Sequence, residues 1–517
     1  MSETGAESMG GEVRGGRRTA AAWVLTAVGI VWLAVFPLTC DFTYTHLTLA
    51  KWAAMGIGAG LTLGGLAAAA ILRGGLRLRT RSLRIFALFL GWIALSGLFG
   101  AGAGNRTADG LPVTLLGARH EGLISWLGYG LIFFTMAQAK ARLEVIVPAA
   151  ADALALQLLL IALQYANLNP LSLFPNRRSI LTNYEFQGTF GNIDMLAGYL
   201  SLVLPLTLVP WALRGGWGRG LAAMAGMGGV LLCLLTEVQA GKIMLAVLGL
   251  GILVLFLTRP ETRWRCMILL YGAALCLLLR GCIRLPWLGE TGAEHAALAL
   301  PSLRRGLVCG AVMALSCGLA VLFRFFPGKA LRGRWALLIL ACIVTLALLT
   351  VALLPVPESA GGLWEIHETL NFRARDGFGS ERVGIWRTAL GLIREHPLFG
   401  LGYGNFQRAS LQWQAANGMT LAQRFDNPHN FPLELAVNAG VPAMLLFGWL
   451  AVTLLRACRR DREHGPAIAL CLACWLAQSF FSFSICITSP MAWAVFGLIA
   501  AGEPEVRRPA GTQQEAL

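Results

Sequence analysis

The sequence predicts an all-α protein: a polytopic bundle of about 12–14 transmembrane helices, with a long, partly helical external loop before the last two or three spans. Three observations predict this fold. Of the 517 residues, 56% are hydrophobic and only 13% are charged, whereas soluble domains carry roughly 25% charged residues. About fourteen apolar runs approach the ~20 residues that a helix needs to cross ~30 Å of hydrocarbon. Basic residues cluster between these runs, as they do in loops that flank membrane helices.

The same composition excludes several other classes of protein. Disordered chains are polar and rich in charge, and 12 cysteines are too dilute for a small disulfide-stapled scaffold. The net charge of +15 by itself suggests nucleic-acid binding. However, the 38 Arg and 4 Lys are scattered in short clusters between apolar runs. We therefore expect membrane loops and no nucleic-acid partner.

The apolar runs divide the chain into five parts. Residues 1–19 are expected to form a cytoplasmic tail, and residues 20–356 a transmembrane bundle of about eleven spans. Residues 357–430 form a large extracytoplasmic loop, residues 431–502 the C-terminal transmembrane helices, and residues 503–517 a second cytoplasmic tail. The first run lacks the small-residue cleavage site of a signal peptide, so we interpret it as a signal anchor. The runs begin near residues 20, 47, 84, 121, 144, 193, 220, 241, 266, 306, 335, 431, 467 and 490.

The distribution of Lys and Arg predicts the orientation. With the N-terminus inside, 25 of the 42 basic residues lie in inside segments and 15 in outside loops, and two lie at span edges. Seven of the outside residues belong to the loop at 357–430, and long loops escape the positive-inside rule. We therefore expect a multi-pass protein of the cytoplasmic membrane with both termini in the cytoplasm.

The long external loop holds seven arginines and seven acidic residues, so the placement of individual charges matters more than the sum. Residues 381–394 (ERVGIWRTALGLIR) predict an amphipathic helix that ends before Pro397. Its apolar face is expected to carry Val383, Trp386, Leu390 and Ile393.

Two further segments of the loop suggest function. Residues 400–406 (GLGYGNF) resemble a glycine-rich phosphate loop, but no strand precedes them. Tight backbone packing is the favoured interpretation. Residues 426–430 (DNPHN) place His429 at the mouth of a span. It is either a general base or a hydrogen-bonded interfacial histidine, and the residues alone leave both open.

Several segments together resemble the O-antigen ligase and polymerase family of membrane glycosyltransferases. They keep one order along the chain from about Arg119 onward: 119–122 (RHEG), 188–200 (GTFGNIDMLAGYL), 382–386 (RVGIW), 396–406 (HPLFGLGYGNF), 429–434 (HNFPLE) and 438–442 (NAGVP). Two positions depart from the family pattern. Asp194 replaces a usual Asn, and Lys242 stands where the family commonly has an Arg after Ser. A Lys does not reproduce the bidentate fork of an Arg, which puts that phosphate contact in doubt.

The resemblance implies transfer of a glycan from a polyprenyl-diphosphate carrier to an acceptor hydroxyl at the outer face of the membrane. Arg contacts phosphate bidentately, and cations neutralise the charge that develops on a diphosphate leaving group. By resemblance, Arg382 holds the diphosphate and His429 is the base, with Glu434 or Asp426 as its orienter or rival. The remaining expected substrate-binding residues are Arg119, Arg387, Arg177 or Arg178, Lys242, Asn192, Asp194 and Asn430.

The sequence shows no carboxylate pair with metal-ligand spacing, so we expect neither a metal nor another cofactor. The expected partners are the lipid-linked glycan donor, membrane lipid, and a glycan, lipid or protein acceptor. Ligase, polymerase and protein O-oligosaccharyltransferase activities all remain open. The rival from another class is a secondary transporter, but such folds tend to show inverted repeats and charges at mid-membrane. A scaffold for envelope assembly would instead make the arginines and the histidine of the loop dispensable.

Overall fold

The computed structural model describes residues 3–173, 187–286, 296–419 and 424–505, and side chains from residue 15 onward. It is a helical bundle in which eleven helices of the described part are long and apolar enough to cross a membrane. This confirms the predicted polytopic helical fold. The first span continues from α1 through a π-helical turn (Val31–Val35) into α2 (Phe36–Leu38). The spans are α1 (Glu3–Ile30) with α2, α3 (Leu47–Arg73), α4 (Arg81–Phe99), α7 (Leu143–Tyr165), α9 (Ile193–Arg214), α10 (Trp217–Leu235), α11 (Gln239–Thr258), α12 (Arg263–Cys282), α13 (Leu303–Phe325), α14 (Gly333–Leu353) and α18 (Phe431–Cys458).

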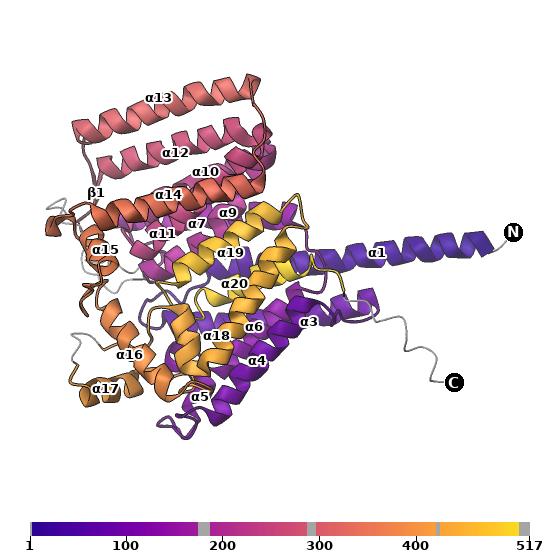
Figure 1. The fold of residues 1–517 in the computed structure, drawn as a ribbon. Helices are drawn as coiled ribbons and strands as arrows, with labels where there is room; N and C mark the ends of the chain where they lie inside the picture. Colours follow the sequence, from indigo (N-terminus) through magenta and orange to yellow (C-terminus); the bar gives the residue numbers. More distant parts are fainter. Residues whose placement is uncertain (1–2, 174–186, 287–295, 420–423, 506–517) are drawn as a thin grey trace, which may run out of the picture.

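Three shorter apolar helices complete the bundle: α6 (Leu123–Met136), α19 (Gly465–Ser479) and α20 (Ser489–Ala500). Helix α9 lies at the centre and packs against α7, α10, α11 and α19, so its hydrophobic window is 83% buried. Helices α12, α13 and α14 lie at one side of the bundle (Figure 1). Short strands β1 (Ile283–Arg284) and β2 (Ala297–Leu298) pair antiparallel between α12 and α13. The core therefore sits around α9, α18 and α20, and α13 and α14 form a periphery that is mostly exposed.

The segment between α14 and α18 is partly helical, as predicted. It contains α15 (Gly362–Leu370), α16 (Arg382–Glu395) and α17 (Phe406–Ala416), on the side of the bundle remote from the protruding start of α1 (Figure 1). The predicted helix 381–394 is α16, shifted by one residue. Its expected apolar face was wrong at Leu390, which is 48% exposed. Trp386 and Ile393 are half-buried and pack against the buried cluster, whose centre is instead Ile385, Ala389 and Leu392. These three pack against Leu401, Phe406 and Val437, which periodicity within the helix cannot reveal.

The glycine-rich segment 400–404 packs against a break in α18. Gly440 has φ 82° inside α18, and this non-helical geometry interrupts the helix. The amides of Leu401 and Gly402 donate to the carbonyls of Val437 and Asn438, at 2.9 and 2.8 Å. A Cβ atom on Gly400 would lie 2.6 Å from the Val437 oxygen. These contacts confirm the interpretation of tight backbone packing, and they fix the segment against the first half of α18.

The predicted inside loops gather at one end of the bundle. Arg77 donates to the carbonyls of Ala137, Ala501 and Glu503, and Arg214 forms an ion pair with Glu463. Similarly, Arg265 donates to the carbonyl of Ala212 at 2.7 Å. The sorting of loops into two sets is therefore consistent with the fold, while the membrane side that each end faces stays a prediction.

Candidate active site

Four segments that are far apart in the sequence meet around His429. Residues 424–430 lead into α18, and a turn before α6 carries Arg119. The third segment is the start of α16, with Arg382, and the fourth is the stretch between α19 and α20, with Phe483. Both Arg119 and His429 adopt positive φ, 50° and 47°, which is uncommon for residues other than glycine. The turns at these two positions are therefore held by their surroundings.

Arg119 and Asp426 form the most direct link between these segments. The Nε of Arg119 lies 2.5 Å from Oδ2 of Asp426, and the guanidinium lies over the ring of Phe483, 5.3 Å from its centroid. Asn427 donates to Oδ1 of Asp426 at 2.7 Å and accepts from the backbone N–H of His429 at 3.0 Å. One carboxylate thus orients both an arginine and the turn that presents the histidine.

The imidazole of His429 sits edge-on between two aromatic rings. Its centroid lies 5.6 Å from that of Phe425 and 5.0 Å from that of Phe483. Burial lowers the pKa of His429 to about 4, and the neighbouring cations Arg382 and Arg119 lower it further, against the opposing effect of Asp426. The imidazole is therefore neutral at neutral pH and has a nitrogen lone pair available to accept a proton.

Arg382, the first residue of α16, approaches the same histidine without a carboxylate partner in the described part of the chain. Its Nη1 donates to the carbonyl of Gly379 at 3.2 Å, and its Nε is buried with no protein acceptor. Four residues later, Nε1 of Trp386 donates to the carbonyl of Pro428 at 2.9 Å, next to His429. Trp386 therefore anchors α16 to the loop that carries His429. Arg382, four residues earlier on the same helix, places its positive charge near the imidazole.

Beneath this group lies a buried polar network that involves two carboxylates. Oε2 of Glu434 accepts from the backbone N–H of Ser484 at 2.8 Å, and the hydroxyl of Ser484 donates to Oε1 of Glu121 at 2.5 Å. The hydroxyl of Tyr129 donates to the other oxygen of Glu121 at 2.7 Å. Burial raises the pKa of Glu121 to about 7, although both hydroxyl donors act to lower it. A cavity of about 30 Å³ connects this network with the Arg119–Asp426 pair.

Glu434 was expected to orient His429 or to compete with it as a base. The structure joins it to Ser484 instead, and among the described residues no hydrogen bond connects it to His429. Glu121 and Ser484 were not among the expected site residues. Glu121 did lie in one of the quoted motifs, beside Arg119, whereas Ser484 sits in an aromatic stretch with no motif. Only the three-dimensional contacts reveal this serine.

Two of the expected substrate-binding residues cap helices. The side chain of Asn192 accepts from the backbone N–H of Asp194 at 2.7 Å at the start of α9. The side chain of Asn430 accepts from the N–H of Leu433 at 2.9 Å at the start of α18. Both therefore satisfy amides that helix starts leave unpaired. Asp194 lies in the first turn of α9, and its carbonyl accepts from Nε2 of Gln478. A role of these three residues in substrate binding stays a prediction.

The remaining expected cations already have carboxylate partners or cannot be placed. Arg387 is 2.8 Å from Asp376, and Lys242 is 2.5 Å from Glu237, which Arg280 also contacts. A phosphate contact of Lys242 or Arg387 thus has to compete with an existing ion pair. Arg177 and Arg178 lie outside the described residues. Across the described part, no three His, Cys, Asp or Glu side chains gather as ligands for a metal ion.

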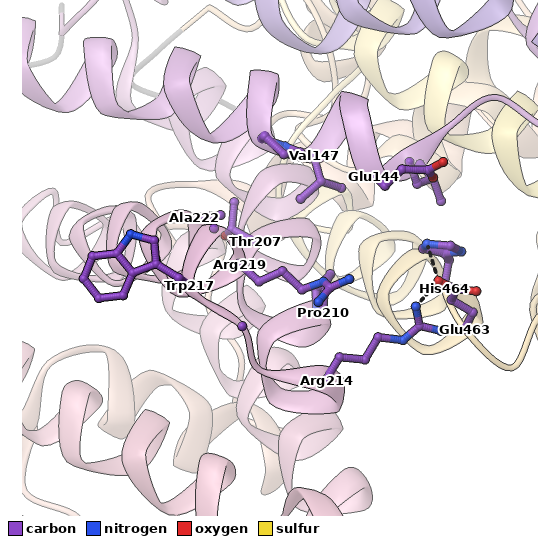
Figure 2. Close-up of a pocket in the computed structure, with 14 residues that line it drawn as sticks. Glu144, Val147, Thr207, Pro210, Arg214, Trp217, Arg219, Ala222, Glu463 and His464 are labelled. Carbon is purple, nitrogen blue, oxygen red and sulfur yellow. Dashed lines mark hydrogen bonds and ion pairs between the residues drawn. The ribbon is translucent and has the colours of Figure 1, made fainter. Parts of the chain in front are cut away.

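A second cavity, of about 350 Å³, lies at the other end of α18, beyond Cys458. Figure 2 shows Arg214 reaching from the end of α9 to Glu463, with His464 beside this pair and Trp217 turned away from it. The side chains of Glu144 and Arg219 also line this cavity. It is far from His429 and has no contact with the group described above, so it does not belong to the candidate active site.

Residues 296–448 match the family model described as O-antigen ligase. The matched stretch includes Arg382, His429 and Glu434 and ends inside α18, whereas Arg119 lies outside it. No curated protein matches the chain significantly.

Proposed function

We propose that this chain, whose residues 296–448 match the O-antigen ligase family model, transfers a glycan from a polyprenyl-diphosphate carrier to an acceptor hydroxyl. The match over residues 296–448 and the eleven apolar helices long enough to cross a membrane support a multi-pass membrane protein of the glycosyl-transferring type. We further propose the identity of the donor and of the acceptor, and the residues that act on them. The outer face of the membrane is its expected place of action.

One observation carries the proposal: a neutral imidazole lies beside two arginines, one of which has a buried, unsatisfied N–H group. Arg382 has no carboxylate partner in the described residues, and its orphan Nε needs an acceptor. Leaving a buried donor unpaired costs roughly 1–3 kcal/mol. A diphosphate would supply that acceptor and the opposite charge at once, because arginine binds phosphate through parallel N–H groups.

The proposed transfer proceeds as follows. The acceptor oxygen attacks the anomeric carbon of the donor glycan, and its proton passes to the neutral imidazole of His429. The bond between that carbon and the diphosphate oxygen breaks, and its electron pair leaves with the carrier diphosphate. Arg382 and Arg119 stabilise the negative charge that develops there. The diphosphate also offsets the two cations that lower the pKa of His429, so the bound donor strengthens this base.

We assign Glu434 as a positioning residue in this scheme. Its carboxylate holds the backbone of Ser484, and the neighbouring Phe483 packs against the ring of His429. Glu121 holds the same serine through its hydroxyl. The two glutamates therefore keep one wall of the histidine pocket in place, while Asp426 holds the turn from the other side.

Reconstitution with a polyprenyl-diphosphate saccharide tests the proposed function. The purified protein in lipid vesicles is supplied with the donor and, separately, with a repeat-unit glycan, a lipid-linked saccharide core or a serine-containing peptide. Transfer to the first acceptor identifies a polymerase, to the second a ligase, and to the third a protein O-oligosaccharyltransferase. If none of these acceptors gains sugar while the protein transports the donor, the assignment as a transferase is wrong.

A further inference from the structure

A long groove lies between α10 and α12, outside the site proposed above. Its volume is about 870 Å³, and its walls are mainly apolar side chains of these two helices. Small residues of α10 open it: a Cβ atom on Gly220 would meet no atom closer than 3.5 Å. Met224 and Leu221, which line the groove, are 71% and 50% exposed. The groove therefore faces the hydrocarbon around the bundle and suits an extended acyl chain.

One end of the groove is cationic. The guanidinium groups of Arg265 and Arg324 both lie over the ring of Trp264, at 4.9 and 5.1 Å from its centroid. Arg265 uses its Nε and one terminal nitrogen on backbone carbonyls of Ala212 and Leu213. Within the described residues, Arg324 has no hydrogen bond or ion pair. Two neighbouring positive charges thus share one end of the groove, and Arg324 keeps all of its donors free.

Arg214 lines the same end, but its charge is compensated. Arg214 is paired with Glu463 on the side of the adjoining cavity (Figure 2). The positive charge at this end of the groove therefore comes from Arg265 and Arg324, and Glu261 offsets part of the charge of Arg265.

The tryptophans mark this end as the level of lipid headgroups. Trp217, at the start of α10, is 84% exposed and lines the groove. Exposed tryptophans at helix ends prefer the interface between hydrocarbon and water. Phosphate groups of phospholipids lie at this depth, where basic residues between helices attract them. The cationic end therefore fits the phosphate of a lipid headgroup, and the apolar walls of the groove fit an acyl chain of the same molecule.

We propose that this groove is a specific site for an anionic phospholipid, with its phosphate at Arg265 and Arg324 and one acyl chain between α10 and α12. The site lies at the end of the bundle where Arg265 contacts the last turn of α9, opposite to the end that carries His429. It is independent of the proposed transferase activity, so either assignment can fail without the other.

Native mass spectrometry of the purified protein tests this site, with phosphatidylglycerol and phosphatidylcholine titrated in detergent. The wild-type protein is expected to retain phosphatidylglycerol over phosphatidylcholine. Arg324→Gln should reduce that preference about fivefold, the contribution of one basic residue near an anionic headgroup. The matched control is Arg334→Gln on α14: Arg334 also stacks on a tryptophan, Trp335, but it lies outside the groove. This variant is expected to behave like the wild type.

A second pair of variants tests the apolar part of the groove. Gly220→Leu fills it near its cationic end and should reduce retention of the anionic lipid. Gly310→Leu on α13, where a Cβ atom would meet nothing within 4 Å, is the control and should not. Equal retention of both lipids by the wild type would overturn the proposal. A loss of retention in Arg334→Gln equal to that in Arg324→Gln would also overturn it, because any surface arginine would then act in the same way. Unchanged retention in Gly220→Leu would overturn it too, because the lipid would then bind without the groove.

Discussion

The carboxylate of Glu434 accepts a hydrogen bond from the backbone N–H of Ser484 at 2.8 Å. Glutamine can accept this bond through its amide oxygen, whereas alanine cannot. We therefore expect Glu434→Gln to keep most of the transfer activity. Glu434→Ala should lose about tenfold, because the Ser484 amide, whose unpaired burial costs roughly 1–3 kcal/mol, shifts and no longer holds Phe483 against the ring of His429. Transfer rates of the two variants at saturating donor measure this difference. If Glu434→Gln were as inactive as Glu434→Ala, Glu434 would be acting through its charge and not through its position.

The pH dependence of transfer should report the ionisation of His429. Because its pKa is lowered to about 4, kcat/KM should stay level at neutral pH and fall only as the pH drops through about 4. Arg119→Gln removes a cation that lowers this pKa, so the pKa rises and the acid limb moves to higher pH. Arg387→Gln is the control, because Arg387 pairs with Asp376 and is not among the charges that act on His429. Identical acid limbs in all three proteins would contradict the assignment of His429.

The break in α18 should depend on the absence of a side chain at Gly440. Gly440 has φ 82°, and a Cβ atom there would overlap the carbonyl oxygen of Leu398. Gly440→Ala is expected to lower the midpoint of thermal unfolding in detergent, with strain of about 1–3 kcal/mol from the backbone alone. Gly448→Ala, in the same helix and with open space around the position, should leave it unchanged or raise it. If Gly440→Ala unfolded at the same temperature as the wild type, the packing of residues 400–404 against α18 would not require a glycine at position 440.

Transfer is expected to continue in the presence of a chelator. In the proposed scheme the charge on the leaving diphosphate is stabilised by Arg382 and Arg119, and guanidinium groups need no metal for this. The measurement is the initial rate with and without EDTA. If the rate fell in EDTA and returned on addition of a divalent ion, the reaction would require a metal ion, contrary to this expectation.

The helical bundle could be predicted from the sequence because the membrane imposes it. Backbone groups in hydrocarbon have to be paired within the segment, so long apolar runs become helices regardless of their partners. The buried face of α16 could not be predicted in this way. Leu390 fits the apolar periodicity but is exposed, and Ile385 and Ala389 are buried because Leu401 and Val437 come back against that side.

The candidate site could be predicted only where its residues lie close together in the sequence or in a motif. Arg382 and His429 belong to such segments, and the fold brings both to the same place. The hydrogen bond between Ser484 and Glu121 joins residues 363 positions apart, and no local pattern points to it. Asn192 and Asn430 did carry an unused signal, because an asparagine just before a helical run is a common N-cap.

Glycan transfer by His429→Ala and Arg382→Ala, from a polyprenyl-diphosphate saccharide, tests the proposed active site most directly. Removal of a general base typically costs 10²–10⁴-fold in rate, so we expect His429→Ala to lose at least about 100-fold and Arg382→Ala to be similarly inactive. Arg394→Ala, which changes an exposed side chain in the last turn of the same helix, is the matched control and should transfer normally. Thermal unfolding midpoints establish that each variant is folded. Transfer at the wild-type rate by both folded variants, His429→Ala and Arg382→Ala, would contradict the assignment of this site.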